Sequence, residues 1–183
     1  MKLRAEPYTL ELRHDMKDSE QSLRGRLNLK WCDGVLFNVI AKENSDKAEY
    51  DVIQWNEQDK SILFIEYKNS VQAYKNLKAH EAQQNKDYAR NIARAFCFLK
   101  YDFIIVVRSL EQNFEKVKGK GNVISLDELT NYLPEFESTL EELDYTDKLL
   151  DKYNRLENPV EFRRETVLKE MKILRDKIEQ VNK

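Results

Sequence analysis

Glycine and proline are scarce in this chain, which has four glycines and three prolines among 183 residues. Disordered segments and flexible linkers are usually enriched in these residues, so the sequence predicts a folded protein. Long apolar runs are also missing, and no stretch is long enough to span a bilayer or resembles a secretory signal. We therefore expect a cytoplasmic protein that does not enter membranes.

Cysteine is equally rare, and the two that occur, Cys32 and Cys97, lie far apart in the sequence. Two cysteines suggest no disulfide framework and cannot complete a four-cysteine zinc or iron–sulfur site. This usage fits a reducing compartment. Charged residues are abundant at 35%, but the net charge of −2 gives the chain no overall basic footprint for nucleic acid.

The most informative stretch covers residues 48–69. Its two runs rich in β-branched and aromatic residues, 50–55 and 62–67, flank a polar link, which is typical of a β-hairpin. With the turn centred in the link, between residues 58 and 59, Asp51 faces Glu66, and Lys68 follows on the same face. The sequence therefore predicts two carboxylates and an ammonium at one end of an apolar hairpin.

Directly opposed carboxylates repel each other, so a cation between Asp51 and Glu66 is expected. Mg²⁺ prefers one or two carboxylates, keeps several waters and takes further oxygens from a substrate phosphate. The main-chain carbonyl of Tyr67 could add a ligand, and Lys68 would hold an attacking water and stabilise developing negative charge. The alternative is a solvated charge cluster at the sheet edge, in which Lys68 pairs with its cross-strand neighbour Glu49.

A helix signal precedes the hairpin, beginning at Asp18 or Ser19 and running to about Trp31. Glu20 shares a face with the apolar positions of this helix and could complete a metal shell if the helix packs over the hairpin. Equally, Glu20 could simply occupy the first turn, where acidic side chains suit the helix dipole.

The other segments alternate between strand and helix periodicity. Strands are expected at 8–12, 34–41, 103–107 and 122–126, a polar loop at 42–47, and helices at 76–100 and 127–133. The run 103–107 is fully apolar and predicts a central strand buried on both faces. Gln84 and Tyr88 are expected on the inner face of the long helix. Residues 1–134 are therefore expected to form an α/β core with a mixed central sheet.

Residues 135–183 are expected to form a C-terminal α-helical extension, with helices at 138–157 and 160–182. The second helix has apolar residues at heptad spacing, at Val160, Val167, Met171, Leu174, Ile178 and Val181. This seam could pack on the first tail helix, on the core or on a second copy of the chain, and the spacing leaves all three open.

Asp51, followed after fourteen residues by Glu66-Tyr67-Lys68, resembles the PD-(D/E)xK nuclease superfamily. Tyr50 stands where that pattern often has proline. The resemblance covers roughly residues 17–133 and implies a restriction-endonuclease-like αβββαβ core, in which a helix before the sheet often supplies a further acid. Glu20 matches that position.

Gln84 and Tyr88 resemble the Gln-x-x-x-Tyr motif of the RecB-type exonuclease branch, in which these two residues contact DNA beside the metal. A buried polar pair within the core is the alternative. Some members of that branch carry a cysteine-bound iron–sulfur cluster, for which this chain has too few cysteines.

The resemblance implies a Mg²⁺-dependent deoxyribonuclease that also accepts Mn²⁺, with Asp51, Glu66 and Lys68 as catalytic residues. DNA would be its partner, and a local basic patch could bind the DNA backbone despite the near-neutral total charge. The residues available for that patch are Arg90, Arg94, Lys116, Lys118 and Lys120. The rival functions are a nucleic-acid-binding or assembly module without turnover, and an interaction protein that dimerises through its tail.

We predict that the heptad seam either joins two copies of the chain or closes as a helical hairpin on residues 138–157. Light scattering distinguishes the two arrangements. A mass of two chains for the full protein, and of one for a chain ending at Pro134, would identify the tail as a dimer interface. A monomeric full chain would remove the dimer and leave the intramolecular arrangement.

Overall fold

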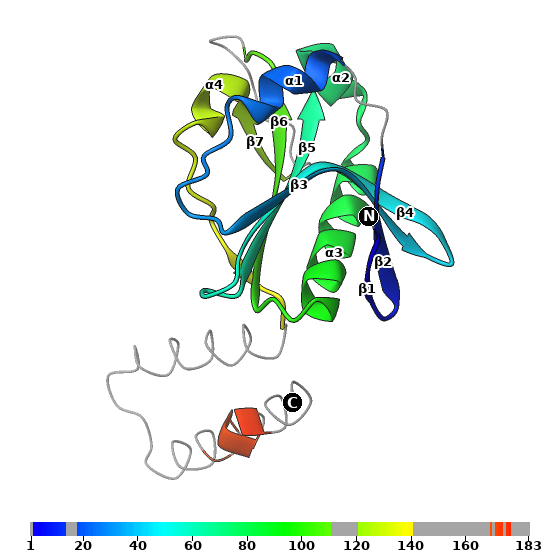
Figure 1. Ribbon diagram of the computed structural model, residues 1–183, viewed down its shortest axis with the longest axis vertical. Coiled ribbons are helices and arrows are strands. Elements are labelled where there is room, and N and C mark those ends of the chain that lie inside the picture. Colours follow the sequence, from blue (N-terminus) through cyan, green and yellow to red (C-terminus); the bar gives the residue numbers. More distant parts are fainter. Residues whose placement is uncertain are drawn as a thin grey trace. The chain divides into compact units, whose positions relative to one another are not determined.

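The computed structural model describes residues 2–13, 18–110 and 121–140, together with 169, 171–173 and 175–176. The chain divides into two compact units, residues 1–139 and 140–183. The first unit is built on a mixed sheet with the strand order β1-β2-β3-β4-β5-β6-β7, and a short strand β8 pairs with β6 (Figure 1). The expected α/β class with a mixed central sheet is therefore confirmed.

Strands and helices follow one another along the chain with these bounds. The N-terminal half contains β1 (Lys2–Ala5), β2 (Tyr8–Leu12), α1 (Asp18–Arg24), β3 (Gly34–Glu43), β4 (Ser45–Asn56) and β5 (Ser61–Lys68). The rest of the unit contains α2 (Val71–Asn76), α3 (Ala79–Ala95), β6 (Lys100–Val107), β7 (Asn122–Ser125), α4 (Leu126–Leu129) and β8 (Glu137–Ser138). Strand β8 lies beyond Pro134, so the chain after that proline still contributes to the sheet.

Pairing is antiparallel from β1 to β5 and parallel from β5 through β6 to β7. Parallel neighbours need a crossover connection, which α2 and α3 supply between β5 and β6. The β4–β5 register pairs Ile53 with Phe64 and Trp55 with Ile62, as the sequence predicts. The hairpin turn is therefore centred between residues 58 and 59, as predicted.

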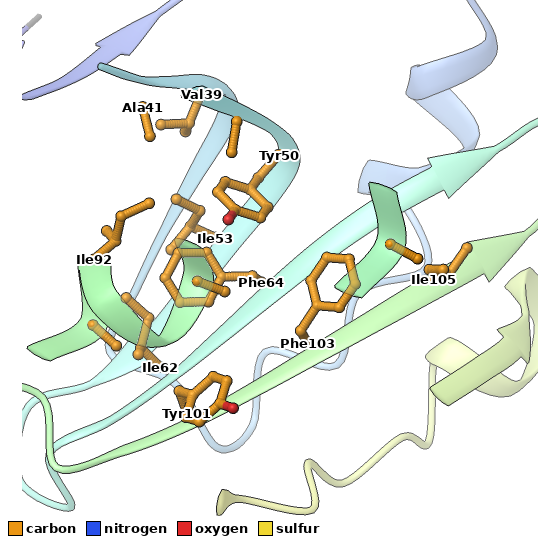
Figure 2. Packing of buried hydrophobic residues seen from close by; sticks show 14 of the residues in the cluster. Val39, Ala41, Tyr50, Ile53, Ile62, Phe64, Ile92, Tyr101, Phe103 and Ile105 are labelled. Atoms are coloured by element: carbon orange, nitrogen blue, oxygen red, sulfur yellow. The ribbon is translucent and has the colours of Figure 1, made fainter. Parts of the chain in front are cut away.

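Each face of the sheet carries its own apolar core. On one face α3 packs on Tyr50, Phe64 and Phe103, which come from three adjacent strands and gather closely in Figure 2. On the other face Leu23 of α1 and Leu129 of α4 pack with the side chains of β5 and β6 that point away from α3. Strand β6 is buried from its second residue to its last, which confirms the expected central strand.

The helix expected at 76–100 forms as α3 but is shorter, from Ala79 to Ala95, and a separate short helix, α2, precedes it. Helix α2 begins at Ser70, whose hydroxyl accepts a hydrogen bond from the main-chain N–H of Ala73. Leu77 is extended, and Lys78 then starts α3 by donating its main-chain N–H to Glu81. After α3 ends, Cys97 adopts a left-handed conformation (φ 63°), which turns the chain into β6.

Two further sequence predictions need correction. Helix α1 ends at Arg24 rather than near Trp31, and Gly25, a poor helix former, follows it directly. The expected loop at 42–47 instead belongs to β3 and β4, which meet at Asn44 in a left-handed conformation (φ 64°). Asparagine tolerates this conformation better than most residues, so a tight turn replaces the loop.

Most of the expected C-terminal extension lies outside the described residues, including Val160, Val167, Leu174, Ile178 and Val181 of the seam. Among the described ones, Lys169, Met171 and Ile173 are helical, with Met171 buried and Ile173 exposed. Within the described parts of the chain, no helix has the length and apolar character needed to cross a membrane.

Gly34 opens β3 directly opposite Trp55. A Cβ added at Gly34 would overlap the Trp55 indole, whereas a Cβ at Gly25 would meet nothing within 4 Å. Glycine is thus required at position 34 for a steric reason, because the indole lies against the bare backbone.

We predict that Gly34→Ala lowers the free energy of unfolding by about 1–3 kcal/mol, the usual range for forcing atoms into a packed site. Gly25→Ala is the matched control and should leave stability unchanged or slightly higher. Urea unfolding of the three proteins measures both effects. Equal stability of Gly34→Ala and wild type would show that the indole can move aside at little cost.

Candidate active site

Strands β3 and β4 are kinked at one shared point, and Asp51 lies there. Phe37 pairs with Val52 and Val39 with Tyr50, and between them Asn38 adopts a left-handed conformation (φ 52°). Regular alternation would place Tyr50 and Val52 on one face of the sheet, yet they pack in opposite cores. The kink therefore turns β4 away from β5, and the β4–β5 ladder ends at the pair Val52–Ile65.

Beyond this last pair, the side chain of Asp51, rather than the main chain of β4, contacts β5. Its carboxylate accepts a hydrogen bond from the main-chain N–H of Tyr67 at 2.5 Å. In a strand the N–H and C=O of one residue point to the same side, so the Tyr67 carbonyl also points toward Asp51. The neighbouring carbonyl of Lys68 points the other way and accepts from the main-chain N–H of Arg108 at 3.0 Å.

Glu66 is a buried acid in the middle of the sheet, 8% exposed, and both of its oxygens have partners. The Lys68 ammonium lies 2.7 Å from Oε1, and the Asn85 amide donates to Oε2 at 3.1 Å. Glu49 instead pairs with Arg13 at 2.7 Å. The sheet-edge cluster in which Lys68 pairs with Glu49 is therefore not the arrangement that forms.

Asn85 comes from α3 and was missed by the sequence analysis. The buried residues of this helix are Ala82, Ala89, Ile92 and Ala93, so Asn85 lies on the same stripe, three residues after Ala82 and four before Ala89. That spacing is the signal that could have identified it.

The sequence predicts Gln84 on the inner face of α3, but in the structure Gln84 is exposed. Tyr88 is half-buried and packs against the core. The helix thus presents Asn85, not Gln84, to Glu66. The motif roles of Gln84 and Tyr88 in DNA contact stay predictions.

Tyr50 links Asn85 to the kinked strand. Its hydroxyl donates to the main-chain carbonyl of Asn85 at 2.8 Å. Burial raises the pKa of the Tyr50 phenol well above its ordinary value, and the nearby Glu66 carboxylate raises it further. The phenol therefore stays protonated and remains a donor at physiological pH.

Helix α1 packs over the hairpin, which is the arrangement that Glu20 needs if it is to complete a metal shell. Leu23 is buried among Ile65 and Tyr67 of β5. Glu20 lies in the same helix, three residues earlier, but its side chain is outside the described residues. Its role as a third acid stays a prediction.

Arg108 is a second cation at this end of the sheet that the sequence analysis did not select. It follows β6, is exposed, and its positive charge partly offsets the rise that burial causes in the pKa of the Tyr67 phenol. Arg90 instead lies near Tyr101, where its positive charge partly offsets the rise in the pKa of the Tyr101 phenol. Tyr101 is near the opposite end of β6. Lys116, Lys118 and Lys120 lie outside the described residues.

The donor set fits Mg²⁺ in kind and number. Asp51, Glu66 and the Tyr67 carbonyl supply hard oxygen ligands, which Mg²⁺ and Mn²⁺ prefer. In the described part of the chain, no three or more His, Cys, Asp or Glu side chains gather into a metal site. The remaining ligands would thus be waters and substrate oxygens, and Lys68 supplies the positive charge beside Glu66 in the structure as it stands.

No protein-family model matches this chain, and no curated protein sequence matches it either.

We predict that the protein binds Mn²⁺ and that Asp51→Asn weakens this binding at least tenfold. Asparagine keeps an oxygen for the Tyr67 N–H but removes the charge that attracts the metal, so the local hydrogen bond is preserved. Titration calorimetry measures the affinity. Asp59→Asn, an exposed acid at the other end of the hairpin, is the control of equal charge and should bind as wild type does. Equal affinity in Asp51→Asn and wild type would exclude Asp51 as a ligand.

Proposed function

We propose that this protein is a metal-dependent nuclease that hydrolyses phosphodiester bonds in DNA. The observation that carries the proposal is the contact of the Asp51 carboxylate with the main-chain N–H of Tyr67, the residue between the paired Glu66 and Lys68. Asp51 and Tyr67, sixteen positions apart, thus come into contact at the kink. Together with Glu66 and Lys68 they form the pattern that resembles the PD-(D/E)xK superfamily.

The element order supports a restriction-endonuclease-like core. Helix α1, strands β3, β4 and β5, helix α3 and strand β6 follow one another as αβββαβ. The β1–β2 hairpin and the short helix α2 would be additions to this core. The candidate site lies where β5 and β6 end, and ligands of open α/β sheets commonly bind at the carboxyl ends of strands.

Each residue of the site has a distinct role in this proposal. Asp51 and Glu66 hold the metal, and the Tyr67 carbonyl adds a neutral oxygen. Bound Mg²⁺ would supply an acidified water and would neutralise charge on the phosphate. The Lys68 ammonium lies within contact distance of Glu66, so it can orient that water and stabilise the charge that grows on the phosphate oxygens.

Binding of DNA needs cations near the site because the chain as a whole is slightly acidic. Lys68 ends β5 and Arg108 directly follows β6, and the main-chain N–H of Arg108 donates to the main-chain carbonyl of Lys68. Arg108 is exposed, and in this proposal it contacts a phosphate next to the one that is cleaved.

We predict that Lys68→Ala slows DNA cleavage on the order of 10²–10³-fold, the usual loss when one preorganised electrostatic group is removed. Metal affinity should stay near that of wild type or rise, because a cation next to the metal has been removed. Without metal the variant should also be less stable by about 1–3 kcal/mol, because Glu66 loses one of its two donors.

Lys100→Ala is the matched control, since Lys100 is an exposed strand lysine beside Ser61 at the opposite end of the β5–β6 pair. Cleavage of single-stranded, duplex and branched DNA with Mg²⁺, Mn²⁺ or EDTA measures the activity. Wild-type cleavage rates in Lys68→Ala would refute the catalytic assignment. DNA binding by the wild type without cleavage of any substrate would favour a module that binds nucleic acid without turnover.

A further inference from the structure

The two oxygens of Glu66 are held by donors of different kinds. Oε1 faces the Lys68 ammonium, a cation on the same strand, at 2.7 Å. Oε2 accepts from the Asn85 amide at 3.1 Å, and Asn85 is a neutral residue in the middle of α3. A metal cation repels the ammonium but not the amide, so the two partners respond differently when a metal arrives.

Asn85 is itself held in place from its other side. The Tyr50 hydroxyl donates to its main-chain carbonyl at 2.8 Å. Tyr50 is fully buried, and its ring centroid lies 4.8 Å from that of Phe64 and 6.2 Å from that of Phe103 (Figure 2). Two hydrogen bonds, from Tyr50 to Asn85 and from Asn85 to Glu66, form a bridge. Because Tyr50 directly precedes Asp51, this bridge connects the strand of Asp51 to the carboxylate of Glu66.

We propose that Asn85 is a positioning residue that holds Oε2 of Glu66 and leaves Oε1 for the metal. This inference rests on the proposed metal site. Glu66 would offer Oε1 to a bound metal in place of the Lys68 ammonium, which would then be available to water and phosphate. Without the Asn85 amide, the carboxylate turns freely and Lys68 can pair with either oxygen, so the metal competes less well.

The test compares two amides of α3, Asn85 and Gln83. Asn85→Ala should weaken Mn²⁺ binding about 10–100-fold, the usual cost of losing a group that orients a metal ligand. Gln83→Ala removes an exposed amide from the same helix, one that is hydrogen-bonded to Asp87, and should bind Mn²⁺ as wild type does. Calorimetry measures the affinities, and melting temperatures without metal confirm that each variant is folded.

A cleavage assay separates positioning from a general structural role. In Asn85→Ala, cleavage should fall steeply at low Mn²⁺ and recover largely at saturating Mn²⁺, because the residue acts on metal occupancy. Tyr50→Phe removes only the hydroxyl that holds Asn85 and should weaken Mn²⁺ binding in the same direction by a smaller factor. This second variant decides the question if Asn85→Ala does not fold.

Each outcome has one meaning. Wild-type affinity in Asn85→Ala, or in Tyr50→Phe where Asn85→Ala is unfolded, overturns the positioning role and leaves the metal site intact. Equal weakening in Asn85→Ala and Gln83→Ala overturns the distinction between the two amides and, with it, the inference. Failure of the wild-type protein to bind Mn²⁺ overturns the metal site itself and the inference that rests on it.

Discussion

The burial of one negative charge, on Glu66, constrains the rest of this structure. Strand β5 has neighbours on both edges and cores on both faces, so the carboxylate has little water to solvate it. An ionised carboxylate in such a place is costly unless it is paired and hydrogen-bonded. Lys68 from the same strand and Asn85 from the covering helix meet this demand, and an apolar side chain would have made both unnecessary. A sequence that keeps the acid at this cost favours function over stability.

The kink in β3 and β4 is the second requirement of the site. A regular β4 would have continued its ladder past Ile65, and a main-chain carbonyl of β4 would then have satisfied the Tyr67 N–H. The left-handed Asn38 breaks the alternation, so the Asp51 carboxylate replaces that carbonyl. The irregularity therefore converts an ordinary strand pairing into a place where an acid of β4 contacts the main chain of β5 at the residue directly after Glu66. Strand irregularities commonly occur next to active sites for this reason.

The sequence predicted the hairpin well and the covering helix poorly, and the physical reasons differ. The hairpin register follows from the period of two and from one symmetric turn, both of which are local. The phase of α3 depends on tertiary packing, and its buried stripe consists largely of the small residues Ala82, Ala89 and Ala93. These let the helix lie close to the sheet, whereas the pattern of large side chains had placed Gln84 inside. Asn85 follows the spacing of this alanine stripe and therefore lies on the inner face.

Tyr50 shows how a departure from a motif can be compensated. The pattern that this chain resembles often has proline before its aspartate, and proline would stiffen the strand there without donating any hydrogen bond. Tyrosine supplies both a large packed ring and a hydroxyl, and here the hydroxyl reaches across to α3. The helix that covers the site is thereby fastened to the strand that carries Asp51, one residue from the carboxylate. In this chain Asp51 is thus held next to a residue that contacts α3, the helix whose Asn85 amide donates to Glu66.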